Sequence, residues 1–285
     1  MLNIPAILAK KHASLIVNNW LDLPSASLNP GGFMRVNNVG YAGADVVSIG
    51  GDWLFRGGEI IMGIMSAPVT AIVPAATFTG YTLSSAASGA DTLITATGAH
   101  GLTAAFAVGK SIYVSAGTGW TPGFYAITAI ALDTTGTSIQ IALPYSAGRG
   151  APTIALPNTL IPFMTLSLPP LLNNSVITTD VSFEFTNSAT SKTPIIKLGA
   201  TEFFNSQVTT NDSGSYHHAI RNKGSKTAQV GSLNNFQQSG WGSTTGSPVN
   251  GTEDTTNGAT LYIGTKIAGA NLFSRINVGV VRLIR

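Results

Sequence analysis

Apolar and polar residues alternate along residues 181–186, VSFEFT, which is the period of a β-strand with one buried face. Residues 187–192, NSATSK, have turn chemistry, and residues 193–204, TPIIKLGATEFF, read as a second strand with Gly199 inside it. A glycine at such a position marks a bulge or a close approach of another backbone. Two strands are not stable alone in water, so this pattern predicts partner strands elsewhere in the chain.

The same sequence pattern continues over residues 157–285, where strand-like segments alternate with polar loops. The runs are IPFMTLSL, SVITTDVSFEF, TPIIKLGATEFF, YHHAIRNKG, AQVGSL, ATLYIGTKI and INVGVVRLIR. This arrangement favours a jelly-roll-like β-sandwich in an all-β protein. Residues 237–258, rich in Gly, Ser, Thr and Asn, are too polar for a core and are predicted to form a long surface loop.

Residues 78–156 differ in texture and are predicted to be an inserted domain. They are dominated by Ala, Thr, Gly and Ser, and proline-containing segments flank them on both sides. Short strand-like runs are separated by glycine-rich turns at regular spacing: DTLITATG, GKSIYVSAG, GFYAITAIAL and TSIQIAL. The pattern predicts a small antiparallel β-barrel or sandwich.

The N-terminal part divides into residues 1–30, a helix or arm, and residues 31–77, a β-rich segment. Residues 3–20 place apolar side chains at helical spacing. Such a helix packs on its own domain or docks on a neighbouring protein, and the candidate anchors for docking are Ile4, Ile7, Leu8 and Trp20. Residues 31–77 form an attachment segment or join the main sandwich.

Composition narrows the class of protein. Charged residues make up 9% of the chain and hydrophobic residues 44%, against about 25% charged in an average domain. The apolar content argues against intrinsic disorder, and the low charge favours burial of surface against other subunits. A net charge of +3 without a basic stripe argues against nucleic acid as a partner.

The chain contains no cysteine, which excludes disulfides, thiolate catalysis and cysteine metal sites. No apolar run reaches the roughly 18 residues of a membrane span. Lys10 and Lys11 lie among the apolar residues near the N-terminus and not ahead of them, so this segment does not read as a secretory signal. We expect synthesis in a reducing cytosol and no membrane partner.

The motifs that could carry chemistry are weak. VGKS at 108–111 lacks the earlier glycine of a phosphate-binding loop, because that position is Ala104, and it continues as a strand. His217 and His218 would point to opposite faces of a strand, so they are expected to be structural or to lie near a trimer axis, with no metal site. The 12 acidic residues are scattered. No pair suited to glycoside hydrolysis can be singled out, so we expect no enzyme activity and no cofactor.

Two groups of side chains are candidates for binding a glycan, and each group also has a purely structural interpretation. The basic residues Arg221, Lys223 and Lys226 could attract an acidic glycan, or could belong to a solvated strand end or an inter-subunit ion pair. Aromatic residues could stack on sugar rings or could pack in the core. The candidates for stacking are Trp120, Tyr125 and Trp241.

Two sets of motifs resemble structural proteins of tailed bacteriophages. The C-terminal half resembles a β domain of these virions in which an Asn-Ser-Ala-x-x-Lys turn leads into a strand that ends in Leu/Phe-Gly, followed by an Ile-x-Asn/Arg-x-Gly strand. The matching positions are Asn187, Ser188, Ala189, Lys192, Leu198, Gly199, Ile220, Asn222, Gly224, Gln229 and Gly231. The segment HGLTAAFAVGKSIYVSAGTGWTPGFY at 100–125 resembles a small β module of phage virion proteins.

The resemblance implies a scaffold without a reaction. It indicates a virion component, as a trimeric capsid decoration protein of the cement or head-fibre type that binds the major capsid protein through its N-terminal region. The alternative is a tail-fibre or tail-tip protein that binds a tail protein and recognises glycan on the host surface.

Overall fold

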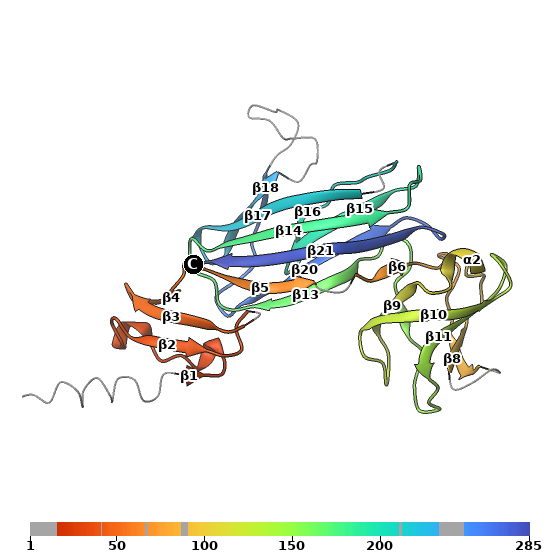
Figure 1. Ribbon diagram of the computed structural model, residues 1–285, viewed down its shortest axis with the longest axis horizontal. Coiled ribbons are helices and arrows are strands. Elements are labelled where there is room, and N and C mark those ends of the chain that lie inside the picture. Colours follow the sequence, from red (N-terminus) through yellow and green to blue (C-terminus); the bar gives the residue numbers. More distant parts are fainter. Residues whose placement is uncertain (1–15, 41, 66–67, 87–90, 211–212, 234–247) are drawn as a thin grey trace, which may run out of the picture.

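The computed structural model describes residues 16–40, 42–65, 68–86, 91–210, 213–233 and 248–285. Their regular secondary structure is almost entirely β-strand, which confirms the predicted all-β fold. No helix among them is long and apolar enough to cross a membrane. The strands make three units that follow one another along the molecule in Figure 1.

The largest unit is a jelly roll. Its eight strands pair antiparallel, the first with the last and so on inward: β5 with β21, β13 with β20, β14 with β17, and β15 with β16. This is the pairing of one long hairpin rolled into a sandwich, as in jelly-roll folds. The bounds are β5 Glu59–Met65, β13 Ile161–Leu168, β14 Val176–Phe185, β15 Lys192–Leu198, β16 Thr201–Phe204, β17 Ser213–Ser225, β20 Ala259–Ile267 and β21 Phe273–Ile284.

Rolling the hairpin produces two sheets. One has the order β5-β21-β14-β17, extended at its edge by β18 (Ala228–Leu233) and β19 (Pro248–Gly251), and the other has the order β13-β20-β15-β16. In β14 every second residue is buried, so Val181, Phe183 and Phe185 face the core as the alternation predicts. Burial of these side chains between two sheets is the main driving force for the sandwich.

The predicted single strand over residues 193–204 is wrong. Gly199 and Ala200 form a two-residue turn between β15 and β16, because Leu198 pairs directly with Thr201. Gly199 has φ of +55°, and a Cβ there would lie 2.1 Å from a carboxylate oxygen of Glu253. The predicted close approach is therefore real, but its partner is a side chain from a distant loop and the glycine ends a strand.

The N-terminal unit is a separate small sheet, with the order β1-β2-β3-β4. The predicted segment 31–77 thus divides, because β2 to β4 belong to this sheet while β5 and β6 join the jelly-roll sheet. The bounds are β1 Ile16–Val17, β2 Phe33–Val36, β3 Ala44–Ile49, β4 Asp52–Phe55 and β6 Thr70–Ile72, with two short 3-10 helices, η1 Trp20–Asp22 and η2 Ala26–Leu28.

The helix predicted over residues 3–20 lies mostly outside the described residues, and its last part is not an α-helix. Ile16 and Val17 pair with Arg35 and Val36 as parallel strands. β-branched residues favour such an extended conformation.

The third unit occupies the predicted insertion, in the connection between β5 and β13. Its sheet has the order β7-β8-β11-β10-β9-β12 and its own core, built around Phe78 and Ile112. β6 links it to the jelly roll by pairing with both β21 and β9. The bounds are β7 Thr82–Ser85, β8 Asp91–Thr95, α2 Ala104–Ala107, β9 Ser111–Ala116, β10 Gly123–Ala131, β11 Ser138–Pro144 and β12 Thr153–Ile154.

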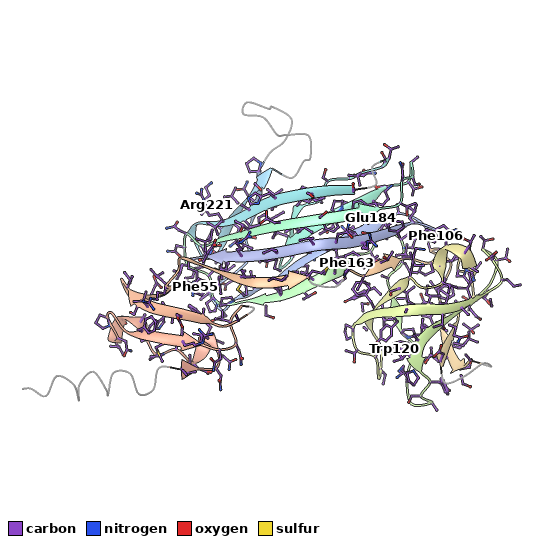
Figure 2. All side chains as sticks on the ribbon, in the orientation of Figure 1. Phe55, Phe106, Trp120, Phe163, Glu184 and Arg221 are labelled. Atoms are coloured by element: carbon purple, nitrogen blue, oxygen red, sulfur yellow. The ribbon has the colours of Figure 1, made fainter. Side chains whose placement is uncertain are left out.

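The two smaller units lie at opposite ends of the jelly roll (Figure 1). Phe55, on the N-terminal unit, and Trp120, on the inserted unit, mark these ends in Figure 2. The inserted unit is held by stacking of Phe124 on Phe163, with ring centroids 5.3 Å apart. Asn271 also bonds it, because its side chain accepts from Thr103 N and donates to Gly101 O. The jelly roll thus separates the N-terminal unit from the inserted unit.

Candidate functional site

Three acidic residues on the jelly-roll strands, Asp180, Glu184 and Glu202, are engaged in ion pairs. Glu184 bonds Arg275, and Glu202 lies 2.7 Å from the Lys266 amine. Asp180 lies between His217 at 2.6 Å and Arg282 at 2.5 Å. The hydrogen bond from His217 is the largest of the effects that lower the pKa of Asp180 below its usual value, with Arg282 acting in the same sense. These carboxylates therefore contribute to ion pairs across the strands of the sandwich.

The adjacent histidines point to opposite faces of β17, as predicted: His217 is exposed and His218 is buried. His100 is also buried, where Nδ1 accepts from Leu102 N and Nε2 donates to Ala131 O. Within the described ranges, no three His, Asp or Glu side chains gather as metal ligands would. The described histidines are placed by strand geometry and packing.

The VGKS segment uses its lysine locally. Gly109 follows the four-residue α2 with φ of +83°. The Lys110 amine lies 4.2 Å from the centre of the Phe106 ring and donates to the Phe106 carbonyl. The helix before it is short and a strand follows it, so backbone N–H groups do not converge on a phosphate position.

Of the three aromatic residues considered for sugar stacking, two are packed in the inserted unit and one lies outside the described residues. Trp120 is 8% exposed, donates from Nε1 to Gly150 O, and packs edge-on against Tyr125. Arg149 lies over the Trp120 ring. Tyr125 is half-buried and donates to Thr121 O. This is the core-packing alternative, in which no broad ring face is offered to a sugar. Trp241 lies outside the described residues.

Of the four candidate anchors, only Trp20 lies within the described residues; Ile4, Ile7 and Leu8 lie outside them. Trp20 is half-buried, with its ring edge-on to Phe55 and beneath the Arg285 guanidinium. Trp20 therefore packs between the N-terminal unit and the C-terminal residue of the described jelly roll.

Other apolar residues of the N-terminal unit are exposed, and we call them the N-terminal apolar surface. They are Ile16, Leu21, Leu28 and Ile49, with exposed fractions from 58% to 80%. Leu28 and Ile49 lie on neighbouring segments, since Ser48 bonds both Gly31 and Gly32 through its backbone. Scattered exposed apolar residues are normal, so these four are candidates for a contact surface and do not by themselves define one.

Hydrogen bonds hold the loop that presents these leucines. The Trp53 indole donates to Pro24 O at 2.8 Å, and the Ser48 hydroxyl donates to Ala26 O at 2.7 Å. Asn19 and Asp22 also bond each other across η1. Because the backbone is fixed at these points, Leu21 and Leu28 are exposed by the fold itself.

A second apolar surface, which we call the sheet patch, lies on the outer face of β5 and β21. Ile64 pairs with Val280, and Ile61 pairs with Arg282. A β-bulge between these two pairs gives β5 one extra residue, so Ile61 and Ile64 lie on the same face although they are three residues apart. Val278 follows on the same face and is 55% exposed. The Asp180 ion pairs border the patch, which gives it a charged rim of both signs.

The sequence reasoning missed a buried polar network beneath β17 and β18. Asn222 donates to Leu172 O and to Thr255 Oγ1, and Gln229 donates to Asn222 Oδ1. Asn222, Gln229 and Thr255 are at most 2% exposed. The network ties two strands to a loop, so its role is to position backbone.

The long surface loop predicted over residues 237–258 is therefore wrong for its C-terminal part. Residues 248–251 form β19, and Thr255 is fully buried with its hydroxyl bonded to Lys226 O. Glu253 accepts from the backbone N–H groups of Ala200 and Thr201. Hydrogen bonds offset the free-energy cost of burying these polar residues. The polarity of the sequence alone does not show that such partners exist.

Comparison with known proteins adds little. No model of a known protein family matches the sequence, and no curated protein matches it. One solved structure that is weakly similar is described as the structure of infectious bursal disease virus Gt strain, at 12% identity and a TM-score of 0.21. The similarity covers 87% of this chain and 65% of that one, so the chain spans less than two thirds of that protein. The fold assignment therefore depends on the strand pairing described above.

Proposed function

We propose that this chain is a non-enzymatic structural component of a bacteriophage virion. In this proposal it is a homotrimeric capsid decoration protein of the cement or head-fibre type. It binds the major capsid protein through its N-terminal region and projects the inserted unit outward.

The observation that carries the proposal is the placement of the units. The N-terminal apolar surface is at one end of the jelly roll and the inserted unit is at the other (Figure 1). A protein that binds a particle and extends from it needs a contact surface at one end only. The sequence motifs shared with phage virion proteins and the low charged content support the same function.

The sheet patch supports self-association. Ile61, Ile64 and Val278 are at least 40% exposed on a flat sheet face, and burying them against other copies would remove this apolar area from water. The rim of Asp180, His217 and Arg282 carries both signs of charge, so identical faces can complement each other. Light scattering of purified protein should give a mass three times that of the chain.

Particle binding tests the attachment end. We expect the L28S variant to bind particles that lack this protein at least about tenfold more weakly, because a buried leucine contributes about 1.5–3 kcal/mol to an interface. Binding is measured by co-sedimentation of purified protein with the particles on a sucrose gradient.

The matched control is L132S. Leu132 is 75% exposed and Leu28 is 80% exposed, but Leu132 lies in the inserted unit after β10. L132S should bind as the wild type does. Equal loss in both variants would mean that the N-terminal end is not the attachment site, and wild-type protein that neither binds particles nor trimerises would refute the proposed function.

A further inference from the structure

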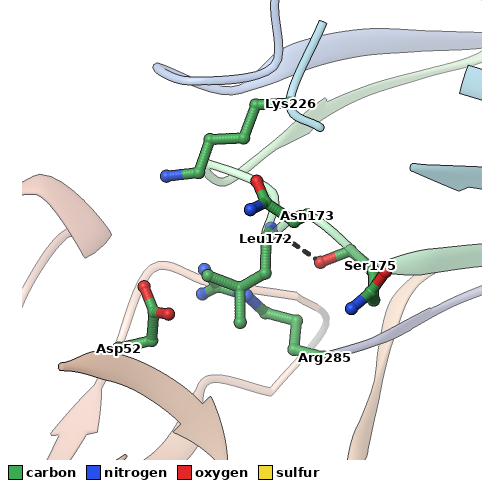
Figure 3. A pocket seen from close by; sticks show the side chains of 7 residues that line it. Asp52, Leu172, Asn173, Ser175, Lys226 and Arg285 are labelled. Carbon is green, nitrogen blue, oxygen red and sulfur yellow. Dashed lines mark hydrogen bonds between the residues drawn. The ribbon is translucent and has the colours of Figure 1, made fainter. Parts of the chain in front are cut away.

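A group of charged residues without ion-pair partners among the described residues lies where the N-terminal unit meets the jelly roll. A cavity of about 390 Å³ opens between β4 and the loop that joins β13 to β14. Figure 3 shows Lys226 reaching in from one wall and Arg285 from the opposite wall, with Asp52 to the side. Asn173, Asn174 and Ser175 complete the polar lining.

Arg285 lacks partners for its charge. Its Nε and Nη1 atoms are buried, and neither has a hydrogen-bond partner among the described residues. The guanidinium lies 4.0 Å from the centre of the Trp20 ring and 5.5 Å from that of Phe55, which fixes its plane without satisfying its N–H groups. Burial lowers the pKa of Arg285 to about 10, and Asp52 opposes this shift.

The local charge is positive. Asp52 is the one carboxylate among the cavity residues, and it forms no ion pair within 4.0 Å of Arg285 or Lys226 in the described structure. The Lys226 amine likewise has no carboxylate partner among the described residues. Among the side chains, two cations face one distant carboxylate in a partly buried site, and such an arrangement is stabilised by an anion.

We propose that this cavity binds a small oxyanion, a phosphate or a carboxylate, through Arg285 and Lys226. A guanidinium is a planar donor group that suits an oxyanion, and the lysine supplies a mobile charge opposite. The Asn173 amide and the Ser175 hydroxyl lie on the same cavity and could bond further oxygens. Occupancy would also join the N-terminal unit to the jelly roll, since the ligand would touch both.

Calorimetric titration of the full chain tests the site. Inorganic phosphate and acetate are titrated separately at one ionic strength held with chloride. Heat with phosphate alone identifies a phosphate site, and heat with acetate alone or with both identifies a site that also accepts carboxylate side chains. Either result supports the proposal, and the absence of saturable heat with both anions would overturn it.

Variants locate the binding. We expect K226Q to raise the dissociation constant about tenfold, since a charge-assisted hydrogen bond contributes roughly 1.5–3 kcal/mol. R285M should abolish binding while keeping the packing between Trp20 and Phe55. D52N should tighten binding severalfold because it removes a repulsive charge, and this result does not depend on whether R285M folds.

The control is K223Q, which removes the same charge from an exposed lysine on β17 outside the cavity. It should bind the anion as the wild type does. If K223Q and K226Q weaken binding equally, the effect is general charge screening, and the proposed site is wrong. Loss of affinity in D52N would also contradict it, because Asp52 would then belong to the binding groups.

Discussion

Replacing Lys192 with alanine is expected to lower the free energy of unfolding by about 4 kcal/mol. Lys192 begins β15 and is 0% exposed. Its amine donates to the carbonyls of Ser188 and Thr209, which lie on the two segments that flank β15 and β16. Alanine would leave a cavity in place of three methylenes and the ammonium, which costs about 2–5 kcal/mol, and would leave two carbonyls without their donor.

Urea unfolding followed by circular dichroism, at one protein concentration, measures this loss. The K192M variant separates its causes, because methionine keeps most of the aliphatic volume and removes the ammonium. We expect K192M to lose about 1–2 kcal/mol.

The matched control is K197A on the same strand. Lys197 is half-buried on the outer face, where its amine lies 5.8 Å from the centre of the Tyr262 ring. Its removal should cost under about 1 kcal/mol. If K192A is no more destabilising than K197A, the buried amine does not hold the flanking loops together.

Lys192 also shows where sequence reasoning stops. The NSATSK segment was predicted to be a turn, and a lysine in a turn is expected in water. Its burial depends on carbonyls that come from Ser188 nearby and from Thr209, which lies beyond the next strand. Local patterns contain no information about such distant acceptors, so a fully buried lysine cannot be read from them.

The strand pattern was more informative because its cause is local. Alternation predicted the buried face of β14 correctly, since each side chain faces opposite to its neighbour whatever the partner strand is. The rule weakens at irregularities. In β5, Ile61 and Ile64 share a face because of a bulge against β21, and the sequence offers no sign of that extra residue.

Candidate sites were predicted less well than strands. Trp120 was selected as a candidate for sugar stacking, with core packing as the alternative, and Trp20 as a candidate anchor of the N-terminal helix; both are packed against arginines and rings of their own chain. Arg285 was not selected, because an isolated basic residue carries no pattern. Its importance arises only from the burial of Nε and Nη1 without partners. Sites of this kind are made by packing between units, which single-strand periodicity does not record.

Acidification is expected to destabilise the jelly roll through His218, with most of the loss between pH 6.5 and pH 4. His218 is 1% exposed, its Nδ1 lies 2.9 Å from Ser232 Oγ, and its Nε2 has no partner among the described residues. Phe204 packs against the ring. Burial, with a smaller contribution from His217, lowers the pKa of His218 from 6.5 to about 4.

The sign follows from proton binding. Between pH 6.5 and pH 4 the unfolded chain binds a proton at His218 and the folded chain does not, so the free energy of unfolding falls as the pH falls. The full loss is roughly 3 kcal/mol, from about 1.4 kcal/mol per pKa unit. Above this window both states are neutral at His218, and the residue adds no pH dependence.

Urea unfolding at pH 7.5, 6 and 4.5 in the wild type and in H218Q measures the effect. H218Q should lose roughly 2 kcal/mol less than the wild type between pH 7.5 and pH 4.5, whatever its stability at pH 7.5. H217Q, which alters the exposed neighbour, should keep most of the wild-type slope. The ion pairs of Asp180 contribute below this window, since a lowered carboxyl pKa acts only as that group protonates. If the free energy of unfolding depends on pH equally in the wild type and in H218Q, the pKa of the buried His218 is not lowered by folding. The folded state would then protonate this ring, and its Nε2 would be in contact with water.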